Sequence, residues 1–533
     1  MMDDLSRKLQ QAGALAARNK VSRRDFMQLA MATGLTAAGA GTLFATAARA
    51  EPKKGGSFRI GIYHGATTDT LDPATYSGGM VATALWGGGA NSLTEVDSKG
   101  AVNGDIAETF EPSDGARKWM FKIRPGVTFH DGKSVTAKDV IASIRHHMGP
   151  DTKSGAKSIL ASVLDVREDN ASTVVFELSE GNADFPFLLS DYHLAIMQAN
   201  ENGTANWQTP VRTGPFTIER FEPGVRTLLK RNPNYHRDVW FDDVTVTVIA
   251  DVAARTNALL TGAVDYIDRC ELKTLNLLER NSNIEVDKVT GYGHHMFIAN
   301  VTQAPFDNRD VRTALKYAID REDIVRKVFA GVYSPANDNP IAPTLQYAID
   351  PQPVHKYDPE RARSYLKKAG LDTLSIDLSV SDAAFAGAVD AALLFKEHAK
   401  AAGIEINVIR EAADSYWDNV WMKKSFSATS LNGRATADWL FTTSYAAEAP
   451  WNETSWKNPR FNELLVQARA ELDQEKRAAM YAEMQQLVHD DGGLINVVWS
   501  TYVSAHSKNV AHGEIAANWE NDGRKIPARW WTA

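Results

Sequence analysis

The sequence predicts an α/β protein of two lobes, with an additional α+β subdomain inserted in the first lobe. Three observations lead to this fold class. With 533 residues, 44% of them hydrophobic, the chain is too long for one core and has material for two or three. Helix and strand patterns alternate through its second half, as in α/β lobes. Two extended segments, 298–301 and 499–503, mark the places where we expect the chain to cross between lobes.

The predicted domain boundaries follow changes in this pattern. A cleft between two hinged lobes is the natural place for a ligand. The predicted parts are a leader (1–50), a first lobe in three pieces (51–90, 206–298 and 500–533), an inserted subdomain (91–205) and a second lobe (299–499).

The first 50 residues have the layout of an export signal. A basic region ends in Ser22–Met27, which contains two adjacent arginines, and a mildly apolar run follows at 29–45. Ala48–Ala50 has the small-residue pattern of a cleavage site. Three glycines interrupt the run, and at about 17 residues it is marginal for spanning a bilayer, which argues against a membrane anchor. We therefore predict twin-arginine export to the periplasm and cleavage after Ala50.

The charge balance excludes some partners. The formal net charge is -8, and because the first 50 residues contribute +4, the remainder carries -12. An acidic body argues against nucleic acid or an anionic membrane surface as a partner. Cys270 is the only cysteine, so no intrachain disulfide can form, and we expect a buried small hydrophobic side chain there.

The stretch 119–140 can be interpreted residue by residue. Apolar residues alternate through Trp119–Ile123 as in a strand, and Pro125–Gly126 then turns the chain. Asp131–Gly132 turns it again, so His130 and Asp131 are predicted to stabilise the turn and not to form a catalytic pair. Thr136, with Asp139 three residues later, predicts a capping box and a helix directly after it.

The other elements follow from the same signals. A Pro-Gly turn at 223–224 between alternating runs predicts a hairpin. Asp320 and Asp358-Pro359 are typical helix starts. The remaining predicted helices cover 253–260, 383–402, 459–472 and 474–490, with one from 309 onward, and the remaining predicted strands cover 57–63, 163–168, 173–178, 404–408 and 494–499.

Motifs for catalysis and metal binding are incomplete. The chain has no Gly-x-Ser-x-Gly or His-Glu-x-x-His motif, and Gly132-Lys133-Ser134 lacks the first glycine of a P-loop. His146–Met148 and His294–Met296 contain ligands that suit late transition metals. Adjacent residues point apart, so each pair can supply only one ligand to a given site. We predict no cofactor and no metal site.

Three motifs resemble one protein family. The string KIRPGVTFHDGKSVTAKDV at 122–140 resembles the signature of the extracytoplasmic substrate-binding proteins of ABC importers, in the peptide- and nickel-binding class known as solute-binding protein family 5. TGPF at 213–216 and RNPNY at 231–235 match two further markers, although His236 follows where Trp is more usual. The resemblance implies the three-domain class of the periplasmic-binding-protein fold.

The resemblance also implies a function. A protein of this class is expected to be a monomer that captures a small solute between its lobes and delivers it to permease subunits in the inner membrane, without catalysing a reaction. Peptides, opine-like amino-acid conjugates and other zwitterions are the leading solute classes. Two alternatives stay open, a nickel or metal-chelate binder of the same family and a secreted hydrolase that uses the same cleft.

A loop after a predicted strand is the strongest candidate for ligand contact. In peptide binders of this class, the resemblance implies, the corresponding loop carries an Asp that holds the ligand's α-ammonium group. Here the nearest match is Arg434, with Asp438 four residues later. We therefore predict that Arg434 binds a carboxylate and that Asp438 or a neighbouring acid faces the cationic end of the ligand. The predicted ligand contacts are Tyr63, His64, Trp86, Tyr292, His294, Trp417, Arg434, Asp438, Trp451 and Asn452.

Overall fold

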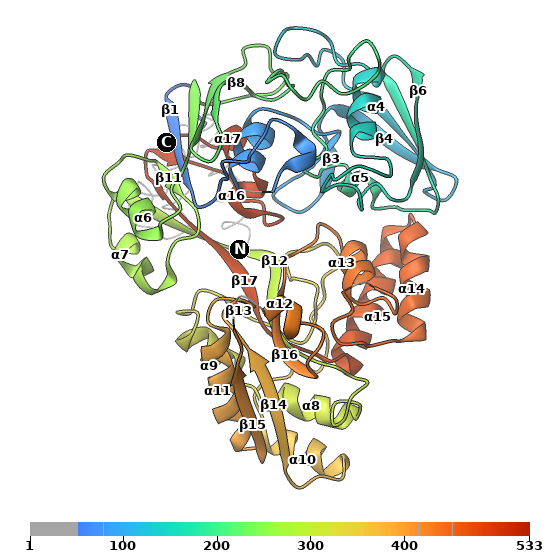
Figure 1. The fold of residues 1–533 in the computed structure, drawn as a ribbon, viewed down its shortest axis with the longest axis vertical. Helices are drawn as coiled ribbons and strands as arrows, with labels where there is room; N and C mark the ends of the chain where they lie inside the picture. The colour runs from blue at the N-terminus through green and yellow to red at the C-terminus, as the bar shows by residue number, and fades with distance from the viewer. Residues whose placement is uncertain (1–51, 78, 413–415, 450) are drawn as a thin grey trace, which may run out of the picture.

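Two lobes are joined by two long strands. The structure, a computed structural model, describes residues 52–533 except 78, 413–415 and 450, so the predicted export signal lies outside the described residues. Figure 1 shows the lobes stacked along the long axis, with β12 (Ile284–Ala299) and β17 (Leu494–Ser507) running from one to the other. These strands pair antiparallel along most of their length. The predicted two-lobe α/β fold is confirmed.

One continuous sheet passes through both lobes. Parallel pairs such as β1–β10 and β14–β15 occur in each lobe, as expected of α/β lobes. The predicted hairpin around 223–224 is formed by the last two strands of the sheet. In order across the sheet, the strands are β15 (Ile404–Arg410), β14 (Leu374–Val380), β16 (Phe426–Leu431), β12, β17, β11 (Tyr266–Ile267), β1 (Ser57–Ile62), β10 (Asp243–Val248), β9 (Arg226–Arg231) and β8 (Phe216–Glu222), with β13 (Ser334–Pro335) paired to β17.

Strand β12 changes its pairing partners before it reaches 298–301, the segment where the sequence predicts a crossover between the lobes. The register of β12 against β17 shifts between Thr290 and His294, and from His294 onward β12 also pairs with β16 of the second lobe. Two glycines lie in this shift. A Cβ on Gly291 would approach the Tyr502 ring to 2.6 Å, so the absence of a side chain lets the two strands cross closely. On β17 the change lies between Trp499, which pairs with β13, and Ala505, which pairs with β11.

The inserted subdomain has its own sheet and core. Trp119, Phe121 and Phe176 are buried in its core. The predicted capping box is present, with the Thr136 amide donating to Asp139 Oδ2 at 2.9 Å. His130 anchors its turn as predicted, with Nε2 3.1 Å from the Gly214 carbonyl oxygen. The subdomain comprises β4 (Ala107–Ser113), β5 (Lys118–Ile123), β7 (Thr173–Leu178), β6 (Val163–Asn170), α4 (Ala137–His146) and α5 (Phe185–Leu188), next to a small sheet of β2 (Thr94–Val96) and β3 (Val102–Gly104).

Helices cover the sheet in both lobes. The second lobe contains α8 (Arg309–Tyr317), α9 (Arg321–Lys327), α10 (Pro359–Lys368), α11 (Ala388–Lys400), α12 (Tyr416–Asn419), α13 (Ala437–Ser444), α14 (Pro459–Ala470) and α15 (Gln474–Asp491). The first lobe contains η1 (Pro73–Thr75), the π-helical segment η2 (Val81–Gly88), α6 (Val252–Leu260), η3 (Leu272–Thr274), α7 (Leu275–Glu279), α16 (Glu520–Gly523) and α17 (Ile526–Arg529), and the C-terminal hairpin β18 (Val510–Ala511) and β19 (Trp531–Thr532).

The helix starts follow local signals. Asp320 and Asp358 each accept a backbone N–H in the first turn of the next helix, as predicted. The helix predicted for 383–402 begins only at Ala388, because Gly387 before it has a positive φ of 85°. Across the described ranges, no helix combines the length and hydrophobicity needed to cross a bilayer.

Candidate ligand-binding cleft

A cleft of about 600 Å³ lies between the two lobes. The first lobe, the inserted subdomain, the second lobe and one residue of β17 line it. The first lobe contributes Tyr63, Arg269, Asn518, Trp519, Glu520 and Arg524; the inserted subdomain contributes Gly155, Ser158, Ile159, Asp191, Tyr192 and His193; the second lobe contributes Asn432, Gly433, Arg434, Ala435, Trp439, Thr443 and Trp451; and Tyr502 of β17 lies between the lobes. The cavity is large enough for a small solute.

Arg434 dominates the second-lobe wall. Its Nη1 donates to the backbone oxygens of Asn432, at 3.0 Å, and Gly433, at 3.3 Å. Its guanidinium carbon lies 5.4 Å from the centre of the Trp451 ring and 5.6 Å from that of Trp439. Within the described part of the chain, no carboxylate forms an ion pair with it. Burial lowers the pKa of Arg434, and among the residues that the structure describes no anion offsets that effect.

The loop that carries Arg434 is held against Tyr292. A Cβ on Gly433 would lie 2.1 Å from the Cβ of Tyr292, so only glycine allows the loop to pass this close. Tyr292 itself is 3% exposed and packs in a core of the second lobe. It therefore supports the Arg434 loop from behind.

The first-lobe wall carries a cluster of two arginines and one acid. Arg269 Nη2 donates to Glu520 Oε2 at 3.1 Å, and Arg524 Nη2 lies 3.3 Å from the same oxygen. The Arg269 guanidinium also stacks 3.6 Å above the Tyr63 ring. Because two guanidinium groups share one carboxylate, this wall keeps one positive charge in excess.

The other acid in the cleft lining is also engaged. Asp191 Oδ1 lies 2.6 Å from His193 Nδ1, and it also accepts the His193 backbone N–H at 3.0 Å. Both lining carboxylates, Asp191 and Glu520, are therefore paired within the protein. Arg434 is not paired with either of them, so the cleft presents a cation that a bound anion can neutralise.

A family comparison places this architecture among binding proteins. The profile of the bacterial extracellular solute-binding proteins, family 5 (middle region), matches residues 101–453. The chain belongs to this family. The protein is therefore an extracellular solute-binding protein, the class that supplies solutes to ABC importers, as the three sequence motifs implied.

Curated relatives match most of the solute-binding protein. It is 25% identical over 465 residues to the glutathione-binding protein GsiB of Escherichia coli K12, which covers 84% of this chain and 90% of that one. It is 27% identical over 467 residues to the protein of the same name from Salmonella typhi, with the same coverage.

Solved structures share the fold of the solute-binding protein. HbpA2 of Haemophilus parasuis matches with a TM-score of 0.78 at 20% identity, over 86% of this chain and 96% of that chain. AgaA of A. tumefaciens R10, solved with agropinic acid, matches with a TM-score of 0.69 at 23% identity, over 90% and 99%. DppA of Helicobacter pylori, solved with the peptide STSA, matches with a TM-score of 0.69 at 22% identity, over 90% and 98%.

The cleft of the solute-binding protein contains some of the predicted contacts. Tyr63, Arg434 and Trp451 line it. His64 is half-buried beside Tyr63, with ring centres 5.6 Å apart, but does not line the cleft. Trp86 is 2% exposed and packs edge-on against the lining residue Trp519 at 5.9 Å, so it supports the wall from behind.

Other predicted contacts point elsewhere. Asp438 forms an ion pair with Arg469 at 3.2 Å in an adjoining hollow of about 350 Å³, where burial raises the pKa of Asp438 to about 6. It does not face Arg434. Asn452 donates to the Trp456 backbone oxygen at 2.7 Å and stabilises a local turn. Trp417 is 42% exposed and packs edge-on against Trp421, away from the cleft.

The histidine pairs do not line the cleft. His294 is fully buried and lies edge-on to the Trp499 ring at 5.3 Å. His146 bonds to Asp72 at 2.7 Å in the first lobe. Neither pair brings a ring nitrogen to the solute cavity.

Apart from Tyr63, sequence reasoning missed the cleft lining contributed by the first lobe, the inserted subdomain and β17. The residues that it did not single out include Tyr192, Arg269, Tyr502 and the segment 518–524. One local signal was present, because 518–524 reads Asn-Trp-Glu-Asn-Asp-Gly-Arg, and Asn, Asp and Gly tolerate positive φ better than other residues. In the structure Asn521, Asp522 and Arg524 do have positive φ. Residues in such strained backbone conformations occur more often at functional sites than elsewhere. Its pairing with Arg269, about 250 residues earlier, has no local signature.

The two lobes touch beside the cleft. Arg477 of α15 forms an ion pair with Asp184 of the inserted subdomain at 2.7 Å, and both side chains are at most 4% exposed. Arg469 of α14 pairs with Glu180 at 2.9 Å. In Figure 1 these helices lie directly below α5 of the first lobe. On this side of the cleft, therefore, charged groups of both lobes are packed against each other.

Proposed function

We propose that the protein is the periplasmic receptor of an ABC importer for a small solute with more acidic than basic groups, such as an acidic peptide or an amino-acid conjugate. Arg434 holds a carboxylate of this solute. The observation that carries the proposal is the Arg434 guanidinium, which lines the cleft without an acidic partner among the described residues.

The chemistry of guanidinium supports a carboxylate. Its planar fork of N–H donors matches the two oxygens of a carboxylate, and it stays charged at any periplasmic pH. Both of its hydrogen bonds within the protein are donated by one nitrogen, Nη1, to backbone oxygens. Nη2 and Nε are therefore left to donate to the solute. The rings of Trp439 and Trp451 lie 5.6 and 5.4 Å from the guanidinium carbon, so part of its surroundings is indole and not water, which strengthens the electrostatic attraction.

The charge balance of the lining supports a solute with net negative charge. A cationic group on the solute would have to compete with His193 for Asp191 or with two arginines for Glu520. An additional carboxylate, in contrast, can approach the positive excess at Arg269 and Arg524. GsiB is named for glutathione, and AgaA was solved with agropinic acid. Both solutes carry carboxylates.

The cellular setting is part of the same proposal. The protein is exported by the twin-arginine pathway, cut after Ala50, and acts as a monomer that meets permease subunits at the inner membrane. No reaction is catalysed, in keeping with relatives that are binding proteins by name. Mass-spectrometric reading of the N-terminus of the periplasmic protein tests the export step, and a soluble pool that starts at Met1 in the cytoplasm would contradict it.

The solute can be identified directly. Native mass spectrometry of freshly purified protein should show a mass excess, and the released solute should be an anion at neutral pH. Calorimetry should then give tighter binding for glutathione or agropinic acid than for the tetrapeptide Ser-Thr-Ser-Ala, which has no net charge. A cleft that prefers the neutral or a cationic peptide would refute the charge argument, while leaving family membership intact.

A further inference from the structure

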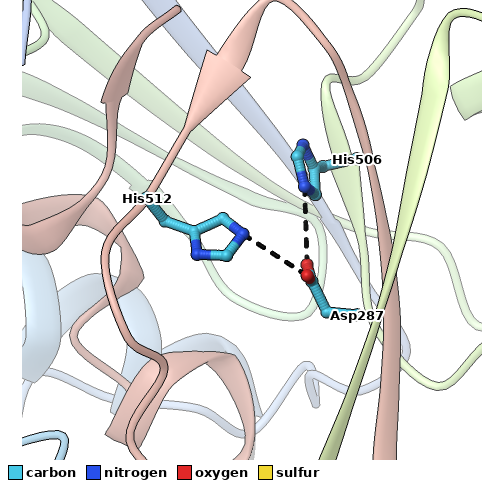
Figure 2. A group of neighbouring side chains, drawn as sticks. All are labelled: Asp287, His506 and His512. Carbon is cyan, nitrogen blue, oxygen red and sulfur yellow. Dashed lines mark ion pairs between the residues drawn. The ribbon is translucent and has the colours of Figure 1, made fainter. Parts of the chain in front are cut away.

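A second polar cluster lies in the first lobe, outside the solute cleft. Figure 2 shows Asp287 facing two imidazole rings, those of His506 and His512. Asp287 is on β12, His506 is on β17, and His512 follows β18. In the ladder, His506 pairs with Glu285, so Asp287 and His506 are diagonal neighbours on one face of the sheet.

The hydrogen bonds of the two rings fix which nitrogen faces Asp287. His506 Nδ1 lies 3.0 Å from the Ser507 carbonyl oxygen, and His512 Nδ1 lies 2.6 Å from that of Gly513. A carbonyl oxygen only accepts, so each Nδ1 must carry the proton. In the neutral rings Nε2 is then a lone-pair donor atom aimed at the carboxylate. Backbone carbonyls hold metal-binding histidines in the same way.

The rings are also held in place by packing. The indole of Trp530 stacks against His512 with ring centres 4.3 Å apart, and it meets His506 edge-on at 5.1 Å. His506 is 2% exposed. Both imidazoles are therefore positioned before any ligand arrives, which lowers the entropic cost of binding.

We propose that Asp287, His506 and His512 bind a divalent first-row transition-metal ion of the zinc type. Two neutral imidazole nitrogens and one carboxylate are a ligand set that such ions prefer. The ligand atoms of the three residues all lie within 4.8 Å of one another, a spacing that one ion can bridge.

The distances fit a metal better than a direct hydrogen bond. His506 Nε2 lies 3.5 Å from Asp287 Oδ2, and His512 Nε2 lies 3.3 Å from Oδ1. A charge-assisted hydrogen bond would be about 2.7–2.9 Å long. Two ligands at about 2.1 Å from a tetrahedral ion are roughly 3.4 Å apart. Moreover, His506 Nε2 and Asp287 Oδ2 are buried and make no hydrogen bond within the described part of the protein.

The cluster has an entry path and room for a fourth ligand. Asp287 and His512 line a hollow of about 650 Å³ whose other walls include Ser98, Thr344 and Glu514. An ion can therefore reach the three protein ligands from solvent, and a water molecule can complete the tetrahedron. Among the lining residues, none is shared with the solute cleft.

Bound metal would join three separate parts of the chain. Asp287 and His506 belong to the two strands that pass between the lobes, and His512 belongs to the C-terminal return to the first lobe. The unfolded chain does not hold these residues together, so binding should stabilise the folded state.

Zinc titration of tag-free periplasmic protein tests the proposal. After EDTA treatment and removal of solute, wild-type protein should bind one Zn²⁺ per chain, by calorimetry and elemental analysis. His512→Gln and Asp287→Asn should each weaken this binding about a hundredfold or more, since removing a ligand costs at least as much as removing an outer partner. Binding equal to wild type in both variants, or no wild-type binding at about 100 μM Zn²⁺, would overturn it.

Two matched controls separate this cluster from other histidines and from the cleft. His146→Gln removes a histidine that pairs with one carboxylate, Asp72, and should leave zinc affinity unchanged. Arg434→Ala should also leave it unchanged, because the cleft is separate. If the ligand variants fail to fold, Co²⁺ absorption of wild-type protein still decides, because intense tetrahedral d–d bands are expected and an octahedral spectrum or no binding would refute the assignment.

Discussion

Removing the Arg434 side chain should abolish most of the solute affinity. In the Arg434→Ala variant the solute carboxylate enters the closed cleft without its cation, framed by Trp439 and Trp451. Truncating one partner of a desolvated charge pair costs about 2–5 kcal/mol. At 1.4 kcal/mol per factor of ten, the dissociation constant should rise by roughly 30-fold to several thousandfold.

The loss should come from charge and geometry together. Arg434→Lys keeps the positive charge but loses the planar fork, so it should recover only part of the affinity. Arg460→Ala is the matched control, because Arg460 is a surface arginine on α14 that pairs with Glu483 at 2.8 Å, away from the cleft. Its affinity should equal that of the wild type.

Calorimetry with the co-purified solute measures these differences. Unfolding by urea, followed by circular dichroism, should show that each variant is folded, so that a loss of affinity is not a loss of structure. Wild-type affinity in folded Arg434→Ala would refute the assignment of the carboxylate to this residue. Equal losses in Arg434→Ala and Arg460→Ala would instead point to an effect on overall charge.

Three further perturbations follow from the structure. Gly433→Ala should weaken solute binding at least tenfold in a folded protein, because the new Cβ would displace the Arg434 loop from Tyr292, and unchanged affinity would mean that the loop adapts freely. Asp184→Asn leaves Arg477 buried without its partner only when the lobes are closed. In this variant closure of the lobes should become less favourable by about 3 kcal/mol. Small-angle scattering at saturating solute should therefore give a larger radius of gyration than for the wild type. An equal radius would contradict a role of Asp184 in closure. Glu453 is buried, which raises its pKa to about 7 from an ordinary 4.5. The stabilising contribution of the protonated Glu453 side chain is therefore present below pH 4.5 and lost as the pH rises through 7. Over this window Glu453→Gln should gain stability relative to the wild type, by on the order of 3 kcal/mol in urea unfolding. A difference that does not depend on pH would refute the assignment.

Local signals in the sequence were reliable where the interacting groups are close along the chain. The capping box of Thr136 and Asp139, the turn glycines Gly126 and Gly132 and the cap at Asp320 all involve partners within four residues. The physical reason is that these interactions need only the backbone conformation of a few residues, which the residue types restrict directly. The family motif lies in the same stretch.

The orientation of cleft residues could not be obtained in this way. Asp438 lies four residues after Arg434, but α13 directs it to Arg469, which is 31 residues farther along the chain. Tyr292 was expected at the ligand and lies behind Gly433. A polar residue near a strand end can face solvent, core or cleft, and the choice depends on which distant element packs against it.

By itself, the sequence determined the two-lobe α/β fold class, the helix caps and turns, and the family, because periodicity and short motifs carry that information. Only the tertiary structure decided the composition of the cleft. Glu520 is joined to Arg269 across 251 residues, and Asp184 to Arg477 across 293. The first contact joins the segments before β12 and after β17, which the antiparallel pairing of these two strands brings together in the first lobe. The second contact joins the two lobes. Long-range packing thus leaves Arg434 as the cleft arginine without an acidic partner among the described residues.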